Sequence, residues 1–294
     1  MRILHVWDQA GVAFVLAKYQ KLRGHNSKAI MAREYDKYGI GRFYNEFIIE
    51  TIKEDFIQRS LYEARSADIL HIHSRADMVS MFRKEFGTSK KIILQYHGSD
   101  VRGIKKQKLP HRSKLSDLVV RGIFTYRRIR DIILRVHLNA QRMADAVIVS
   151  TPDLLPLVSN AFYVPNPVDI EHFKPHILYQ KKKKALTLET EVTNAQWVLD
   201  YCKNKNISLD IEIYDRSQNP IKHADMPSFL GQYTDYVDIK YVNETILQAL
   251  SKTGLEALAC GLSVLDYKLD RRHGLPDEYA PMNVVSRLES VYMH

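Results

Sequence analysis

The feature that most constrains the fold is a regular alternation of strand-like and helix-like runs along the chain. Short apolar runs such as Arg2–Trp7 and Lys91–Tyr96 alternate with runs of helical periodicity such as Val12–Leu22. The second half repeats the alternation from Ala185–Leu188 to Ser251–Leu265. Two series of strand–helix units predict an α/β protein with two Rossmann-like, doubly wound domains that face each other across a cleft.

The same periodicities predict the remaining elements. The other expected strands are Lys28–Ala32, Asp68–His73, Ala146–Ser150, Leu209–Tyr214 and Val237–Tyr241. The other expected helices are Ile48–Ser66, Met78–Phe86, Asn194–Lys203, Met226–Tyr233 and a final helix within Tyr279–Tyr292.

A proline-rich segment separates the two series. Pro165, Asn166 and Pro167 are typical of an interdomain hinge. We therefore expect an N-terminal domain over residues 1–166 and a shorter C-terminal domain over residues 167–278. Residues 279–294 form the expected final helix, for which packing back on the N-terminal domain is one option.

Composition narrows the class of protein. With 294 residues and 45% hydrophobic residues, the chain can bury a substantial core. Cys202 and Cys260 cannot form a disulfide framework, and the start MRILHVWDQ is typical of a first strand rather than a signal peptide. No apolar run approaches the roughly 20 residues that span a bilayer. We expect a cytoplasmic protein, with peripheral association with the inner face of the cell membrane left open.

The net charge of +9 is concentrated in one segment. Residues 102–142 contain twelve Lys or Arg and only two Asp. The interleaved apolar residues favour docking on an anionic membrane surface, with Arg127, Arg128 and Arg130 as contacts. A solvated helical face is the main alternative. Nucleic acid is an unlikely partner because aromatic residues are sparse and no RNA-binding motif is present.

One strand–helix unit near the C-terminus has the make-up of an anion site. A loop of Ser251, Lys252, Thr253 and Gly254 precedes a short helix that carries Glu256 in its first turn. The backbone N–H groups at a helix amino end bind phosphate well, and Lys252 could add charge. The alternatives are ordinary N-capping by Ser251 or Thr253, and a glutamate that complements the helix dipole.

Six motifs, in order along nearly the whole chain, give the sequence a resemblance to a known family. It resembles the group-1, family-four glycosyltransferases of the GT-B fold. The motifs are Arg23-Gly24-His25, ADILHIHS at 67–74, HGSD at 97–100, ADAVIVS at 144–150, VPNPVD at 164–169 with Phe173-Lys174-Pro175, and GLEALACG at 254–261. The resemblance implies transfer of a sugar from a nucleotide-sugar donor, generally with retention, and no metal motif or cofactor.

The resemblance also implies roles for single residues. Glu256 corresponds to the family glutamate that accepts hydrogen bonds from the donor ribose, with Ser251, Lys252, Thr253 and Gly254 beside the donor. Its partner position, eight residues earlier, is Gln248, which could hydrogen-bond a sugar hydroxyl. The remaining implied site residues are His97 against the transferred sugar, Asp100 and Gln9 on the acceptor side, and Gly11 near the donor.

Some of these positions have simpler interpretations. His97 could be a strand-end histidine bonded to a loop, and Gly11 could serve a tight turn alone. We interpret His71 and His73 as buried, hydrogen-bonded residues, because two histidines without a third ligand are poor evidence for zinc. The family's basic pair is replaced by the stretch ETEVTN at 189–194, so Arg216, Lys222 and Lys252 are the candidate phosphate cations.

The leading functional hypothesis is therefore a glycosyltransferase with a glycan or lipid-linked acceptor. Because Gln248 replaces a glutamate, a catalytically degenerate relative that binds nucleotide-sugars or glycans is the second hypothesis. A basic surface-binding protein, with its α/β body as a platform, is the third.

Overall fold

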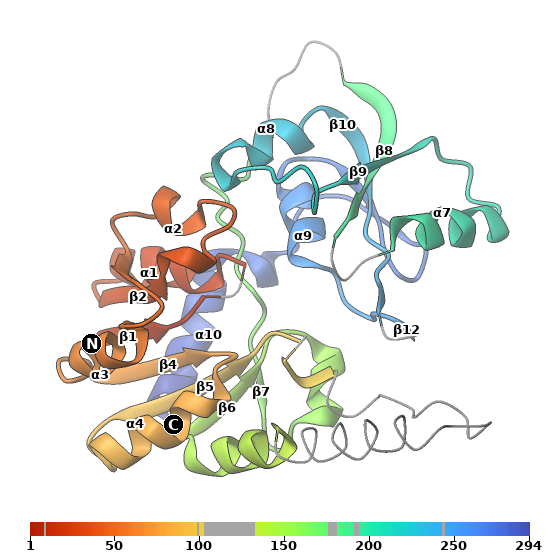
Figure 1. Cartoon of the computed structure of the whole chain (residues 1–294). Helices are drawn as coiled ribbons and strands as arrows, with labels where there is room; N and C mark the ends of the chain where they lie inside the picture. The colour runs from red at the N-terminus through yellow and green to blue at the C-terminus, as the bar shows by residue number, and fades with distance from the viewer. Residues whose placement is uncertain (9, 99, 103–132, 176–180, 191–193, 243–244) are drawn as a thin grey trace, which may run out of the picture.

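The computed structural model describes residues 1–8, 10–98, 100–102, 133–175, 181–190, 194–242 and 245–294. Within them the chain builds a seven-stranded and a five-stranded sheet, each flanked by helices (Figure 1). The first sheet belongs to the N-terminal part of the chain and the second to the C-terminal part. No helix of the described residues is long and apolar enough to cross a membrane.

The first sheet is entirely parallel and has the strand order β3-β2-β1-β4-β5-β6-β7. Its strands are β1 (Arg2–Val6), β2 (Asn26–Ala32), β3 (Ile48–Thr51), β4 (Ile69–His73), β5 (Lys91–Tyr96), β6 (Ala146–Val149) and β7 (Phe162–Tyr163). Strand order reverses between β1 and β4, which is the switch point where doubly wound sheets bind ligands at the carboxyl ends of their strands.

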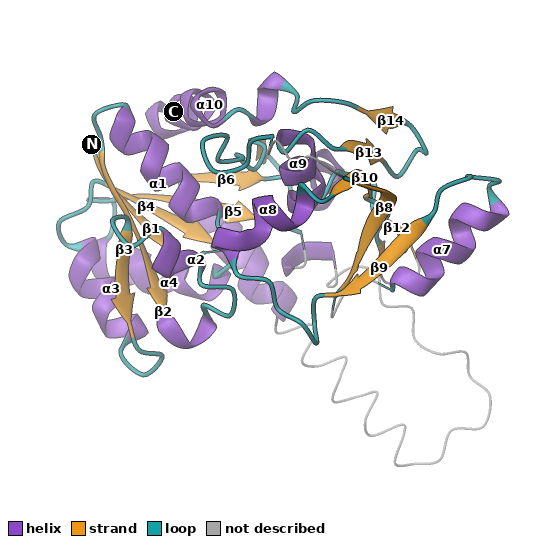
Figure 2. Ribbon diagram, turned by 90° about the horizontal axis from the view of Figure 1, so that it is seen from above, coloured by secondary structure: helices purple, strands orange, loops and turns teal. Residues whose placement is uncertain are grey.

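Helices cover both faces of this sheet, and each face has its own core. Along β1, Leu4 and Val6 pack with α3 (Phe56–Ala64) and α4 (Ala76–Phe86), whereas Ile3 packs with the opposite helices. Those opposite helices are α1 (Val12–Leu22) and the C-terminal α10 (Pro281–Met293). The last helix of the chain thus lies on the first sheet, next to α1 (Figure 2). Three further short elements are η1 (Arg33–Tyr35), α2 (Ile40–Phe43) and η2 (Pro152–Leu157).

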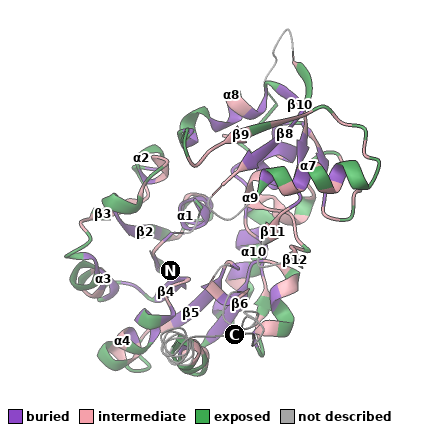
Figure 3. Ribbon diagram, turned by 45° about the vertical axis from the view of Figure 1, so that its right-hand side comes forward, coloured by how far each residue is buried: buried purple, intermediate pink, exposed green. Residues whose placement is uncertain are grey.

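The second sheet has the order β14-β13-β10-β8-β9 and is parallel except for the edge strand β14. Its central strands are buried (Figure 3). Its strands are β8 (Lys182–Glu189), β9 (Ile211–Asp215), β10 (Tyr233–Val237), β13 (Ser263–Leu265) and β14 (Arg271–Arg272). The other elements are α7 (Ala195–Asn204), η3 (His223–Asp225), α8 (Met226–Leu230), the hairpin β11 (Tyr241–Val242) and β12 (Thr245–Ile246), α9 (Lys252–Ala259) and η4 (Asp277–Tyr279).

The predicted alternation of strands and helices in parallel sheets is confirmed, but the bounds of three elements were predicted wrongly. The expected helix Ile48–Ser66 begins as strand β3, because the β-branched run at its start pairs with β2. The strand expected at Val237–Tyr241 lies earlier, as β10 over Tyr233–Val237, and the helix expected over Met226–Tyr233 ends at Leu230 as α8. Strand β10 contains three aromatic or β-branched residues that pack in the core, which favours it over a longer helix α8.

The segment between the two sheets is anchored on both sides. Asn166 accepts a hydrogen bond from His97, which directly follows β5 (3.2 Å), and the Pro167 carbonyl accepts one from Lys252 of α9 (2.6 Å). Just beyond, the fully buried Asp169 binds Lys18 (2.9 Å) and the hydroxyls of two tyrosines of the N-terminal part. These contacts fix the path by which the chain leaves the first sheet.

Candidate functional site

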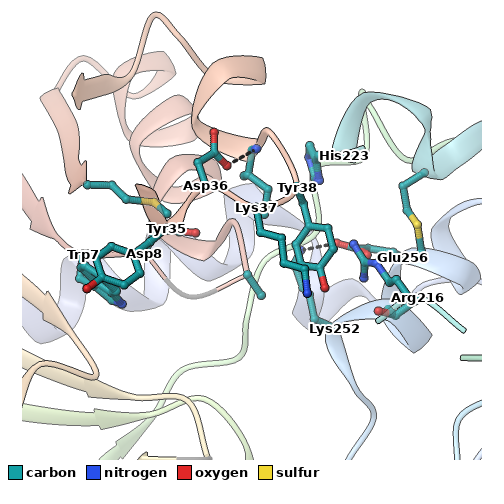
Figure 4. Close-up of a pocket in the computed structure, with 15 residues that line it drawn as sticks. Trp7, Asp8, Tyr35, Asp36, Lys37, Tyr38, Arg216, His223, Lys252 and Glu256 are labelled. Atoms are coloured by element: carbon teal, nitrogen blue, oxygen red, sulfur yellow. Dashed lines mark hydrogen bonds and ion pairs between the residues drawn. The ribbon is translucent and has the colours of Figure 1, made fainter. Parts of the chain in front are cut away.

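A cavity of about 400 Å³ lies between the elements of the two sheets (Figure 4). From the N-terminal part it is lined by Trp7, Asp8, Ala10, Met31, Tyr35, Asp36, Lys37, Tyr38 and Ile40; from the C-terminal part by Arg216, His223, Met226, Lys252, Thr253 and Glu256. Its walls therefore include the carboxyl ends of strands and the amino ends of α1 and α9, where α/β proteins bind ligands.

The loop before α9 is a rigid, self-capped turn. Ser251 accepts a hydrogen bond from the Gly254 N–H (3.0 Å), so it is the N-cap of the helix. The buried Asp238, at the end of β10, binds both the N–H and the hydroxyl of Ser251 (2.7 and 2.5 Å). A Cβ on Gly254 would clash with this carboxylate, so the turn requires glycine. Ser251 and Gly254 shape the loop, while Lys252 and Thr253 line the cavity.

Glu256 and two cations form the charged wall of the cavity. Glu256 is only 6% exposed and lies 3.5 Å from the ammonium of Lys252. Burial raises the pKa of Glu256, and the charges of Lys252 and Arg216 oppose that rise. Arg216 stacks on Tyr38 (4.2 Å from the ring centroid), and its buried Nε has no partner among the described residues. Lys222, the third candidate cation, is exposed and does not line the cavity.

The opposite wall is the amino end of α1, which is closed by a carboxylate. Asp8 accepts hydrogen bonds from the Gly11 N–H (2.7 Å) and the Ala13 N–H (2.8 Å). Burial raises the pKa of Asp8 to about 6, although these two hydrogen bonds and the charge of Lys252 act against the rise. Gly11 has a φ of 82°, a conformation that favours glycine. Its N–H is thus used within the loop.

An aromatic wall was missed by sequence reasoning. Trp7 directly follows β1, has a φ of 74° and packs edge-on against Tyr35 (4.9 Å between ring centroids). Non-glycine residues with positive φ store strain and cluster at functional sites. Tyr38 joins the two parts of the chain, since its carbonyl accepts the His223 N–H (2.9 Å). The available signal was the run Tyr35-Asp36-Lys37-Tyr38, which follows the end of β2 after two residues.

His97 and Gln248 are not among the residues that line the 400 Å³ cavity. His97 binds Asn166 through Nδ1 and His73 through Nε2 (3.0 Å), and burial lowers its pKa. Asp100 holds the same loop by accepting the N–H groups of His97 and Gly98 (3.0 and 2.7 Å). Gln248 and Asn166 line a second cavity of about 190 Å³, which does not include Glu256. Gln248 thus lines a different cavity from Glu256, together with Asn166, the hydrogen-bond partner of His97.

The histidine pair expected in β4 has a third member. His5 lies opposite His71 in the pairing of β1 with β4, and its ring nitrogen is 3.0 Å from that of His73. The three imidazoles are fully buried. The sequence alone could not show that the three histidines lie together, because it does not reveal which strand pairs with β4.

Several predicted contacts lie outside the described residues. These are Gln9 on the acceptor side and the membrane contacts Arg127, Arg128 and Arg130. The described end of the basic segment is a helix over 133–143. It exposes Ile133, Val136 and Leu138 beside exposed arginines.

Comparisons with known proteins identify the fold. No family model matches the sequence, and no curated protein matches it significantly. An α-glucosyltransferase in complex with UDP and mismatched DNA superposes with a TM-score of 0.58 and 12% identity, covering 100% of this chain and 89% of that one. HepE of Anabaena in complex with UDP-glucose gives 0.55 at 10% identity, covering 99% and 90%.

Sucrose-phosphate synthase of Thermosynechococcus elongatus gives a TM-score of 0.53 at 12% identity, also covering 99% and 90%. At such low identity these likenesses establish the fold alone. The chain has an α/β fold with parallel sheets whose structural neighbours are glycosyltransferases of GT-B type.

Proposed function

We propose that this protein is a glycosyltransferase that uses a nucleotide-sugar donor, with the donor bound in the 400 Å³ cavity. The observation that carries the proposal is the grouping of Glu256, Lys252 and Arg216 at the amino end of α9, inside that cavity. The UDP and UDP-glucose in the neighbouring structures support a uridine donor.

The charged wall suits the two polar parts of such a donor. A carboxylate offers two acceptor oxygens to the two hydroxyls of a ribose, which is the role proposed for Glu256. Lys252 and Arg216 would neutralise the pyrophosphate and stabilise the charge that develops on it as the sugar leaves. Arg216 suits this role because its buried Nε is without a partner among the described side chains.

The sugar and the acceptor would lie toward the first sheet. In this proposal His97 orients the transferred sugar, Gln248 hydrogen-bonds one of its hydroxyls, and Asp100 keeps the His97 loop in place. Transfer proceeds with retention, as the family resemblance implies. The segment Pro165–Pro167 acts as the hinge about which the two domains close over the donor and exclude water.

The proposed acceptor is a glycan or a lipid-linked sugar at a membrane surface. Support comes from the exposed apolar side chains and Arg135 on the 133–143 helix, which continues the basic segment. Substituting Arg127, Arg128 and Arg130 by glutamine should weaken sedimentation with anionic vesicles by about 100-fold, at about 1 kcal/mol per residue. The matched control replaces three exposed lysines of β8, at 182–184, and should leave binding unchanged. Equal binding by both variants would rule out docking through the 102–142 segment.

A second candidate function is binding of a nucleotide-sugar without transfer. It is favoured by the position of Gln248, which is exposed and lines the other cavity rather than the one with Glu256. The two candidates differ in turnover of the bound donor.

Thermal unfolding with a panel of UDP-, GDP- and ADP-linked sugars tests both candidates. We expect a UDP-sugar to stabilise the wild type and to have little effect on Glu256→Ala. The absence of stabilisation by every nucleotide would contradict both. Where a nucleotide does stabilise the fold, release of UDP with a panel of acceptors distinguishes the enzyme from the binding protein.

A further inference from the structure

The cluster of buried histidines in the first sheet has the geometry of a metal site. His5 on β1 and His71 and His73 on β4 point to the same face, under α1 and α10. One nitrogen from each ring lies within 4.8 Å of the others, and two of them are 3.0 Å apart. Ligand nitrogens around a tetrahedral Zn²⁺ are about 3.3 Å apart, since each lies about 2.0–2.1 Å from the ion.

Surrounding residues hold the outer nitrogens of the three rings, whereas His5 Nδ1 and His73 Nε2 are bonded to each other (3.0 Å), a contact that a metal ion would replace. Gln20 Oε1, which is only an acceptor, lies 2.8 Å from His5 Nε2, so that nitrogen carries the proton and Nδ1 has the lone pair. The Tyr292 hydroxyl accepts from Gln20 Nε2 (3.2 Å) and lies 2.8 Å from His71 Nδ1; when Nδ1 donates to this hydroxyl, His71 Nε2 carries the lone pair. Metal-bound histidines are normally held by such partners on their outer nitrogens.

Two orphaned polar atoms point to a missing ligand. His71 Nε2 is buried and has no hydrogen-bond partner among the described residues, and the same is true of Gln95 Oε1. Gln95 lies opposite His73 in the pairing of β4 with β5, on the same face of the sheet. Unsatisfied buried polar atoms are rare and costly.

We propose that His5 Nδ1, His71 Nε2 and His73 Nε2 bind one divalent cation of the zinc class, with Gln95 Oε1 as the fourth donor. Imidazole nitrogens with one amide oxygen suit Zn²⁺ better than Mg²⁺ or Ca²⁺, which prefer oxygen ligands. The interpretation of His71 and His73 as buried, hydrogen-bonded residues is confirmed, and sequence reasoning missed the third histidine, His5.

The ion would also orient the sugar-facing histidine. A metal on His73 Nε2 leaves the proton on Nδ1, which is 3.0 Å from His97 Nε2. His97 then carries its own proton on Nδ1 and donates it to Asn166 Oδ1 (3.2 Å). The bound cation thus fixes one tautomer along the line His73, His97 and Asn166. His73 is a positioning residue in this arrangement.

Metal content of the full-length protein tests the site. The protein is incubated with excess ZnCl₂, freed of unbound metal by gel filtration and analysed by elemental mass spectrometry. We expect about one zinc per chain in the wild type and none in His5→Gln/His71→Gln. The control His172→Gln/His223→Gln removes two histidines outside the cluster and should retain the zinc. Replacement by Co²⁺ should give the intense visible absorption of a tetrahedral ion.

The melting temperature of the wild-type protein tests the site without any substitution, so it applies even if the double variant does not fold. Wild-type protein stripped with a chelator should melt about 5 °C or more below the same protein with Zn²⁺ restored, and Mg²⁺ should not substitute. Zinc retained equally by His5→Gln/His71→Gln would overturn the proposal. So would wild-type protein that neither retains zinc nor shifts its melting temperature.

Discussion

The amino ends of α1 and α9 face the same cavity, but the side chains beside them carry opposite charges. At α1 the carboxylate of Asp8 takes the free N–H groups, so the anion-binding end of the helix is already filled by the protein. At α9 a neutral hydroxyl, from Ser251, caps the helix, and Lys252 adds a positive charge beside it. We therefore assign the donor phosphates to the amino end of α9. The amino end of α1 is left for neutral or hydroxyl groups of the ligand.

Removing the carboxylate at α9 should have the largest effect. In Glu256→Gln the ribose loses its charged acceptor, and hydrogen bonds to charged groups contribute about 1.5–3 kcal/mol each. We expect kcat/KM for the donor to fall by about 100-fold, measured by UDP release. Glu63→Gln, in the surface ion pair of α3 with Arg59, is the matched control and should be unaffected. Comparable losses in both variants would place the donor elsewhere.

The turn that holds α9 should be intolerant of a side chain. Gly254→Ala puts a methyl group against the Asp238 carboxylate, so we expect a loss of about 3 kcal/mol in the free energy of unfolding. Thr253→Ala, one residue away, should cost less than about 1 kcal/mol. Urea unfolding measures both. If Gly254→Ala were as stable as Thr253→Ala, the self-capped turn would not have the rigidity ascribed to it.

The amino end of α1 can be tested independently of α9, because Asp8 makes the free energy of unfolding depend on pH. The pKa of Asp8 is raised to about 6 by burial, so its contribution to stability is present below pH 4 and is lost as the pH rises through 6. Asp8→Asn cannot ionise. Its stability relative to wild type should therefore increase by about 2–3 kcal/mol between pH 4 and pH 7.

Urea unfolding at each pH gives this difference, and UDP affinity is the second readout. Because Asp8 does not bind the donor in this scheme, its substitution should change UDP affinity only a few-fold. A difference in stability that does not vary with pH would contradict the assigned pKa. A large gain in UDP affinity would mean that phosphate binds at the α1 end once the carboxylate is gone.

The smallest expected effect distinguishes the candidate cations. Arg216→Met removes one charge from the phosphate site and should weaken UDP binding by about 10-fold, less at high salt. Lys222→Met removes the same charge from an exposed position outside the cavity and should have little effect. Isothermal titration at two salt concentrations measures both. Equal weakening would indicate a general electrostatic attraction in place of a defined phosphate contact.

Local features of this molecule could be predicted from the sequence, whereas contacts between distant residues could not. The hydrophobic periodicities predicted the strands of both sheets. The order of small and capping residues predicted the turn before α9, with Ser251 as one candidate N-cap. The glycine at 254 is required by Asp238, sixteen positions earlier, which no local pattern reveals. Likewise, strand order brings His5 to His71, and tertiary packing brings Arg216 to Tyr38.

The most direct test of the proposed donor site is a crystal structure of the protein with bound UDP. The ribose hydroxyls should lie within hydrogen-bond distance of the Glu256 carboxylate, with the diphosphate beside Lys252 and Arg216 at the amino end of α9. A nucleotide bound in the cavity that contains Gln248, or with its phosphates at the amino end of α1, would contradict this assignment.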